Sequence, residues 1–275
     1  MRTSIIMVGL LMILCLPAFL AFGQDQKDLD YGPYAEVLGQ YVNEKGLVDY
    51  KGLKANRAKL DGFLDTMGKL DRAAHDAWSE DAQIALWINA YNATTLRAII
   101  DHYPIQAGGL SAWLHPDNSI RQIDGVWDDL EYSIMGKDYT IGGIEHEVLR
   151  KDFQEPRIHM AIVCAAMGCP ILRNEPYRGG KLDRQLEEQG RHFLKRDHAL
   201  DLDRQKNRLH LSPIFKWFGE DFEWQYGREL DKYDETEEAI IDFIVKHVEP
   251  EVGDYILKEK PKIKFQDYDW SLNEQ

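Results

Sequence analysis

Apolar residues recur every three or four positions over much of this chain, which is the spacing of amphipathic α-helices. The strongest such stretch covers residues 81–102, where Ile84, Ile88 and Ile99 belong to the apolar set, and Pro104 ends it. Apolar residues also mark helices at residues 34–42, 60–67, 182–194 and 237–248. A short helix is expected at about residues 144–150, and Ser212 as cap, Pro213 in the first turn and Gly219 at the end indicate another at residues 212–218.

A different pattern, the alternation of apolar and polar residues, predicts two β-hairpins. The first joins residues 131–134 to 138–141, and the second joins residues 199–202 to 208–211. Residues 157–164 form a mostly apolar run, which predicts a buried strand. Because no strand–helix–strand rhythm is present, the pattern favours an α+β fold, a single mostly helical domain with a small, mainly antiparallel sheet.

The first 23 residues have the features of a secretory signal peptide. Arg2 precedes an uncharged apolar run that Pro17 interrupts, and the small residues Ala21 and Gly23 precede a cut at Gln24. An uncleaved membrane anchor is the alternative, because the apolar stretch is just long enough to be considered. The sequence therefore predicts an exported protein, periplasmic or secreted, with no stable membrane anchor after cleavage.

The rest of the chain is expected to be a polar lead-in over residues 24–33 and a single globular domain over residues 34–275. The net charge limits which partners this domain can bind. The chain has 33 lysines and arginines and 47 aspartates and glutamates, which give a formal net charge of −14. Such a surface repels phosphate backbones. This argues against nucleic-acid binding and leaves a small molecule or another protein as the partner.

Two cysteines remain after removal of the signal peptide, Cys164 and Cys169. Their spacing is not that of a thioredoxin-type pair, and the chain lacks the ligand spacing of a zinc site, so we expect no metal and no cofactor. In an oxidising compartment an even number of cysteines favours a disulfide. The alternatives are a catalytic thiol, with Cys169 at the start of a helix or Cys164 at the end of a strand, and two inert buried thiols.

Glu145 and His146, on the predicted helix at residues 144–150, are the candidate partners of a catalytic thiol. In the alternative interpretation, His146 is a half-exposed helix histidine and Glu145 only supports its helix. His159 is a weaker candidate, because alternation along the predicted strand places it on the face opposite Cys164.

Asn92 lies on the strongest predicted helix and shares its face with apolar residues, so we expect it to be buried and hydrogen-bonded. It either clamps a neighbouring loop or orients a ligand or a catalytic histidine. We place Trp87, Tyr91 and Asn92 around a candidate ligand cleft, together with the helix that carries Glu145 and His146.

Five segments, in this order, together resemble the domain of unknown function 547 family. They are residues 86–93 (LWINAYNA), 144–150 (IEHEVLR), 156–170 (PRIHMAIVCAAMGCP), 212–222 (SPIFKWFGEDF) and 268–273 (YDWSLN). The resemblance runs from about Val48 to Asn273, and it implies one domain over nearly all of the mature chain. It implies no particular activity.

Two hypotheses on function remain, from different classes. The preferred one is a disulfide-stapled domain that binds a ligand or a partner. The other is a cysteine-dependent hydrolase or acyl transferase that uses Cys164 or Cys169 with His146. The state of the thiols separates them, because a nucleophile must be a free thiol and a staple leaves none.

Overall fold

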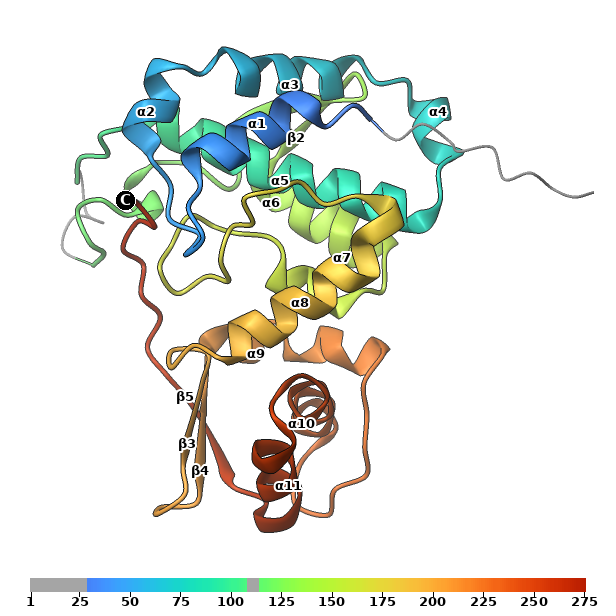
Figure 1. Ribbon diagram of the computed structural model, residues 1–275, viewed down its shortest axis with the longest axis vertical. Coiled ribbons are helices and arrows are strands. Elements are labelled where there is room, and N and C mark those ends of the chain that lie inside the picture. Colours follow the sequence, from blue (N-terminus) through green and yellow to red (C-terminus); the bar gives the residue numbers. More distant parts are fainter. Residues whose placement is uncertain (1–28, 108–113) are drawn as a thin grey trace, which may run out of the picture.

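The structure, a computed structural model, describes residues 29–107 and 114–275, and Figure 1 shows their arrangement. The predicted signal peptide and the first part of the lead-in lie outside the described residues. In the part of the chain that is described, helices predominate over two small sheets, so the predicted α+β fold is confirmed. No helix among these residues is long and apolar enough to span a bilayer.

The N-terminal half is arranged around one long helix, α5 (Glu80–His102), most of whose residues are buried. Ser79 caps α5 by accepting a hydrogen bond from the backbone N–H of Ala82. From residue 29 on, four shorter helices precede it, namely α1 (Gly32–Tyr41), α2 (Tyr50–Ala55), α3 (Ala58–Lys69) and α4 (Arg72–Asp76). Helices α2 and α3 pack directly on α5, and α1 packs on α3.

The first predicted hairpin is confirmed. Strands β1 (Glu131–Ile134) and β2 (Lys137–Thr140) pair antiparallel. The two turn residues both have positive φ, 53° at Met135 and 71° at Gly136. A two-residue turn of this kind matches the right-handed twist of the strands that it joins.

A continuous helical segment follows the hairpin. It consists of α6 (Ile141–Gly143), the π-helical η3 (Ile144–Leu149) and α7 (Arg150–Asp152). Both α6 and η3 pack on α5. The predicted helix at residues 144–150 therefore exists and brings Glu145 and His146 to the central helix.

Residues 157–164 do not form the predicted strand. Pro156–Met160 is a 3-10 helix, η4, and the chain from there to Cys164 is irregular. The apolar run is buried, but side chains of neighbouring helices, not another strand, bind its backbone. The residues after Pro170 form no helix either, so the prediction that Cys169 begins a helix is wrong.

The C-terminal half has its own cluster of buried apolar residues. Strands β3 (Leu200–Asp203) and β4 (Arg208–Leu211) form the second predicted hairpin, and β5 (Lys262–Phe265) pairs parallel to β4. The helices of this half are η5 (Gly179–Lys181), α8 (Leu182–Leu194), α9 (Pro213–Trp217), η6 (Gly219–Trp224), α10 (Glu235–His247) and α11 (Pro250–Glu259).

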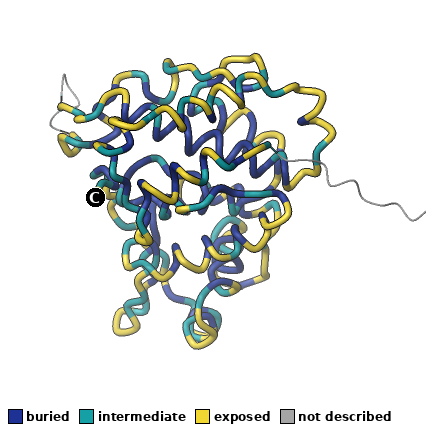
Figure 2. Tube along the Cα trace, turned by 45° about the horizontal axis from the view of Figure 1, so that its top comes forward, coloured by how far each residue is buried: buried dark blue, intermediate teal, exposed yellow. Residues whose placement is uncertain are grey.

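Helix α8 and the C-terminal tail join the two halves (Figure 1). Helix α8 packs on α5, η4 and α10. After β5 the tail returns to the N-terminal half, where the backbone N–H of Val48 donates to the carbonyl of Asn273 at 2.9 Å. On its way the tail places Tyr268 against the buried clusters of both halves. Figure 2 shows that buried segments run through both halves.

Candidate functional site

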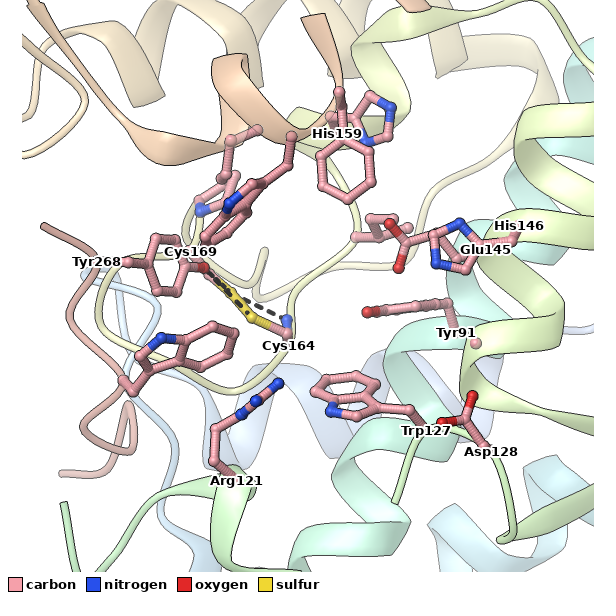
Figure 3. Close-up of a pocket in the computed structure, with 17 residues that line it drawn as sticks. Tyr91, Arg121, Trp127, Asp128, Glu145, His146, His159, Cys164, Cys169 and Tyr268 are labelled. Carbon is pink, nitrogen blue, oxygen red and sulfur yellow. Dashed lines mark hydrogen bonds between the residues drawn. A yellow bond between two sulfur atoms is a disulfide. The ribbon is translucent and has the colours of Figure 1, made fainter. Parts of the chain in front are cut away.

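One cavity of about 250 Å³ collects most of the residues that could perform chemistry (Figure 3). Its lining comes from segments far apart in the sequence: α5, the 3-10 helix η2 (Ile120–Gln122) and the stretch after it, α6, η3, η4, the cysteine loop, α9 and the C-terminal tail. Its polar and aromatic members are Tyr91, Arg121, Trp127, Asp128, Glu145, His146, His159, Cys164, Cys169, Trp217, Phe218, Tyr268 and Trp270.

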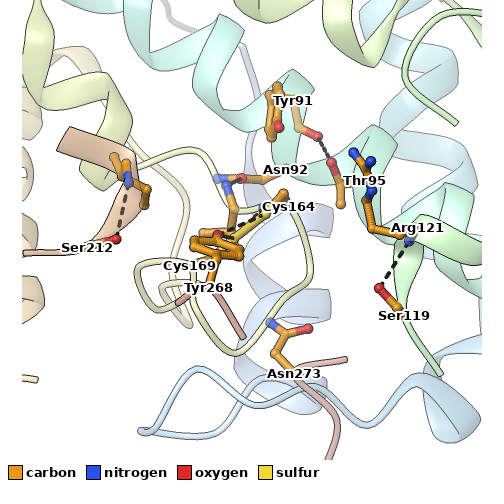
Figure 4. The surroundings of a disulfide bond; sticks show 12 residues. Tyr91, Asn92, Thr95, Ser119, Arg121, Cys164, Cys169, Ser212, Tyr268 and Asn273 are labelled. Carbon is orange, nitrogen blue, oxygen red and sulfur yellow. Dashed lines mark hydrogen bonds between the residues drawn. A yellow bond between two sulfur atoms is a disulfide. The ribbon is translucent and has the colours of Figure 1, made fainter. Parts of the chain in front are cut away.

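The two cysteines lie side by side in this lining (Figure 4). Their Cα atoms are 6.4 Å apart, within the usual range of a disulfide, and their sulfur atoms lie at disulfide distance. Cys169 is buried and Cys164 is half-buried. The backbone N–H of Cys164 donates to Sγ of Cys169 at 3.0 Å, and the hydroxyl of Tyr268 donates to the same sulfur at 3.1 Å.

The C-terminal tail holds the cysteine loop in place through backbone hydrogen bonds. The N–H of Met167 donates to the carbonyl of Ser271, and the N–H of Gly168 donates to the carbonyl of Asp269. A Cβ atom on Gly168 would lie 3.0 Å from atoms of the Tyr268 ring, so a larger residue at this position would require the ring to move by a few tenths of an ångström.

Glu145 extends from η3 into the cavity, where it is buried beside Tyr91. Burial raises the pKa of Glu145 to about 7, against the lowering effects of the hydrogen bond from the Tyr91 hydroxyl and of nearby Arg150. A carboxyl group with this pKa can exchange a proton near neutral pH, as groups at functional sites often do.

His146 is close to Glu145 in sequence but is exposed, and it is held by an arginine. Its Nδ1 lies 3.1 Å from Nη1 of Arg150. Because a guanidinium only donates, Nδ1 of His146 must accept, which leaves the proton of the neutral ring on Nε2. Burial of part of the ring and the charge of Arg150 both lower the pKa of His146. His146 therefore lines the predicted cavity, but its basic nitrogen is already occupied.

The sequence-based prediction that His159 faces away from Cys164 is wrong. It lines the same cavity as Cys164, because the predicted strand that would have turned it away is a 3-10 helix. Its ring is buried, stacks on Phe218 with centroids 4.2 Å apart, and donates from Nε2 to Asp221 at 2.7 Å. Burial lowers the pKa of His159, and the carboxylate of Asp221 partly opposes this.

Asp221 is the centre of this polar network. Its two oxygens accept from Nε and Nη2 of Arg150, at 2.6 and 2.7 Å, in addition to the bond from His159. Although burial disfavours the carboxylate, the hydrogen bonds from Arg150 and His159 lower the pKa of Asp221 to about 2. Nothing in the sequence around Asp221 predicted this role. Asp221 comes shortly after α9, within residues 212–222, one of the five segments that carry the family resemblance.

Arg121 and a group of aromatic rings form the mouth of the cavity. The guanidinium of Arg121 lies 5.0 Å from the centroid of Trp270, and Trp270 contacts the rings of Tyr268 and Trp217. Trp217 is 47% exposed, which is unusual for a tryptophan. Among the described residues, Arg121 has no carboxylate partner. Figure 3 shows its side chain directed into the cavity, on the side away from Glu145.

The predicted cleft is only partly correct. Tyr91 lines the cavity, but Trp87 and Asn92 do not. Trp87 lines a separate cavity, next to Tyr139. Asn92 is buried and bonded to backbone, as predicted, because its Nδ2 donates to the carbonyl of Ala161 and its Oδ1 accepts from the N–H of Val163. Its role is therefore to clamp the loop before Cys164 onto α5, which is the structural alternative.

Replacing Asn92 by Leu is expected to lower the free energy of unfolding by roughly 1–3 kcal/mol. The change leaves a buried carbonyl at Ala161 and a buried N–H at Val163 without partners. Urea denaturation of both proteins measures the difference, and Asn174→Leu, at an exposed position, is the matched control. A change no larger than that of the control would show that the clamp contributes nothing.

Within residues 29–107 and 114–275, no group of three or more histidine, cysteine or acidic side chains has the arrangement of a metal site. The residues that line the cavity supply hydrogen-bonding groups, charge, aromatic surface and sulfur. Such an arrangement can bind an organic molecule, exchange protons through Glu145 and exchange thiols at the cysteines.

Comparison with known proteins finds a match to one family model, and no match to a curated protein or a solved structure. A family model described as "Protein of unknown function, DUF547" matches residues 75–194. The match includes α5, η3, His159 and both cysteines, whereas Asp221 and the C-terminal tail lie beyond it. Residues 75–194 therefore match the DUF547 family, in agreement with the resemblance found in the sequence.

Proposed function

We propose that this protein is exported, is stapled by a bond between Cys164 and Cys169, and binds a small organic anion in the cavity. The observation that carries the proposal is Arg121, which has no carboxylate partner among the described residues and is directed into an aromatic-walled cavity. Its Nε donates only a long hydrogen bond, 3.4 Å, to Nε2 of His115. Binding sites for small molecules typically have such a concave, largely apolar wall with a few convergent polar groups. A guanidinium without a carboxylate partner is suited to a ligand carboxylate.

The cavity also limits the size and shape of the ligand. A volume of about 250 Å³ equals that of roughly eight water molecules, so the ligand has on the order of ten non-hydrogen atoms. Trp127 and Trp270 offer flat apolar surfaces, which favour a planar body. Glu145, when protonated, presents a neutral hydrogen-bonding group to the far end of the ligand. Ionisation of Glu145 adds repulsion, so an anion is expected to bind less tightly at pH 8 than at pH 6.

Three matched probes test the proposal: benzoate, benzamide and benzylammonium. We expect benzoate to bind most tightly, as measured by ligand-observed NMR titration. Arg121→Gln should weaken benzoate about tenfold, the loss of one charge-assisted bond, and should leave benzamide unchanged. Arg208→Gln, at an exposed arginine outside the cavity, is the control. Tightest binding of benzylammonium, or a benzoate affinity insensitive to Arg121, would contradict the proposal.

A second candidate is a cysteine-dependent hydrolase or acyl transferase, favoured by the single cavity that Cys164, Glu145 and His146 share. It requires a free thiol and a basic nitrogen near it. The hydrogen bond from Arg150 to His146 argues against this histidine as the base. A thiol count on denatured protein purified without reductant tests the staple: zero free thiols supports it, and two contradict it. If two are free, rapid alkylation of one of them in the native protein that slows in His146→Ala supports the hydrolase over two inert buried thiols.

A further inference from the structure

We propose that the Cys164–Cys169 pair exchanges with thiols that enter the cavity, with Cys164 as the sulfur that is attacked and Cys169 as the sulfur that leaves. This rests on the disulfide of the proposed function, but not on the ligand that the cavity takes. The geometry points to it because the two sulfurs differ in access and in hydrogen bonding.

Access favours attack on Cys164. Both cysteines line the cavity, but Cys164 is half-buried and Cys169 is 2% exposed. An attacking thiolate must reach the sulfur that it bonds to, so the more open sulfur is the target. In Figure 3, Cys164 lies between Tyr268 on one side and Tyr91 and Trp127 on the other.

Hydrogen bonding favours Cys169 as the leaving thiolate. Its sulfur accepts from the backbone N–H of Cys164 at 3.0 Å and from the hydroxyl of Tyr268 at 3.1 Å. The same hydroxyl lies farther from Sγ of Cys164, at 3.3 Å, and that sulfur has no backbone donor among the hydrogen bonds of the described residues. Both bonds become charge-assisted when that sulfur becomes an anion, and a better stabilised thiolate leaves faster. Burial raises the pKa of Tyr268, so its hydroxyl keeps its proton over the pH range in which thiols react.

The exchange is balanced in atoms and electrons. A low-molecular-weight thiol loses its proton to water, and its sulfur forms a bond to Sγ of Cys164. The bond between the two cysteine sulfurs breaks, and its electron pair stays on Cys169 as a thiolate. A second thiolate can then attack the external sulfur of the mixed disulfide, which releases an external disulfide and leaves Cys164 reduced. Two external thiols are thereby oxidised, and the protein disulfide gains two electrons.

The test uses the native protein and 2-mercaptoethanol, a neutral thiol whose reaction does not depend on binding of an anion. Samples taken at early times are treated with iodoacetamide and digested, and the adducts are located by mass spectrometry. We expect the mercaptoethanol adduct on Cys164 and the alkyl group on Cys169. The opposite placement, or zero free thiols with no adduct, would overturn the proposal of exchange and leave the staple intact. Two free thiols before treatment would overturn both.

Tyr268→Phe tests the stabilisation of the leaving sulfur. The rate of adduct formation should fall about tenfold, the effect of one charge-assisted hydrogen bond on a barrier. Tyr255→Phe, whose hydroxyl bonds to Arg204 outside the cavity, should have no effect. In Cys164→Ser protein, thiolate absorbance against pH should give Cys169 a higher apparent pKa when Tyr268 is also replaced by Phe. An unchanged rate and an unchanged titration would remove Tyr268 from the exchange and contradict the assigned leaving group.

Discussion

Replacing Asp221 by Asn is expected to lower the free energy of unfolding by about 3 kcal/mol at pH 7, the lower end of the range for breaking a buried ion pair. The carboxylate accepts three hydrogen bonds, two from Arg150 and one from His159. An amide has one oxygen, and its NH₂ group would face donors. Asp221 is buried, whereas the side chain of Arg150 is 28% exposed, so water relieves part of the loss.

The pH dependence of this difference identifies its cause. The pKa of Asp221 is about 2, below the ordinary value of 3.8, so its stabilisation is fully present above about pH 4 and is lost as the pH falls toward 2. The gap between the two proteins in urea denaturation should therefore be constant from pH 5 to 8 and narrow in stronger acid. Glu220→Gln, at the exposed neighbouring carboxylate, is the control. A difference in unfolding free energy under about 1 kcal/mol at pH 7 would mean that the cost of desolvating the carboxylate offsets the hydrogen bonds that it accepts.

Replacing Glu145 by Gln is expected to stabilise the protein at high pH and not at low pH. The pKa of Glu145 is about 7 in the folded protein and 4.5 in the unfolded chain, so the folded state binds the extra proton between these values. Stability of the natural protein therefore falls as the pH rises from about 4.5 to 7, whereas the Gln variant lacks this loss. The difference in unfolding free energy should shift by about 3 kcal/mol in favour of the variant between pH 4.5 and 8.

Glu147→Gln is the matched control for this experiment, because Glu147 is exposed on the same π-helical turn. The difference in unfolding free energy between Glu147→Gln and the natural protein should not change with pH in this way. A shift for Glu145→Gln no larger than that of the control would show that the carboxyl at position 145 ionises freely in the folded protein. The same variant should remove the loss of benzoate affinity between pH 6 and 8, which links the titration to the cavity.

The arrangement around the cavity bears differently on the two candidate functions. The binding hypothesis gains Arg121, which the sequence did not single out, and keeps Tyr91 and Glu145. The hydrolase hypothesis keeps Cys164 and His146 in one cavity but loses the basic nitrogen of His146 to Arg150. Thiol exchange needs neither a histidine nor a ligand, since the two donors to Cys169 come from Tyr268 and from the backbone.

Local patterns in the sequence were enough to predict the amphipathic helices and the hairpins, because these elements depend on residues that are close together in the chain. Helix α5 follows from the apolar spacing over residues 81–102 and from the Pro104 that ends it, and the hairpin of β1 and β2 follows from alternation around Met135 and Gly136. Asn92 could be placed because a polar residue on an apolar helical face must find buried partners. The family could be named because its segments keep their order along the chain, and the match to residues 75–194 confirms it.

Only the tertiary structure decided what the apolar run before Cys164 becomes. A continuous apolar run fits a buried strand and a buried irregular segment equally, because periodicity reports burial and not hydrogen-bond partners. Here Asn92 and Gln189 bind the backbone of this run, so no strand forms, and His159 lies on the cavity side. The incorrect prediction of a strand at residues 157–164 is therefore the reason that His159 was assigned to the face away from the cavity.

The site itself was also decided by tertiary structure, since its parts come from the whole length of the chain. Arg150 meets Asp221 across 71 positions, and Tyr268 meets Cys169 across 99. Spacing along the sequence carries information about neighbours within a few turns of a helix or one hairpin, and none about which distant segments pack together. The sequence could name Cys164, Cys169, Glu145 and Tyr91 as chemistry-bearing residues. The tail places them around one cavity, because it bonds to the cysteine loop and packs against Trp217 of α9.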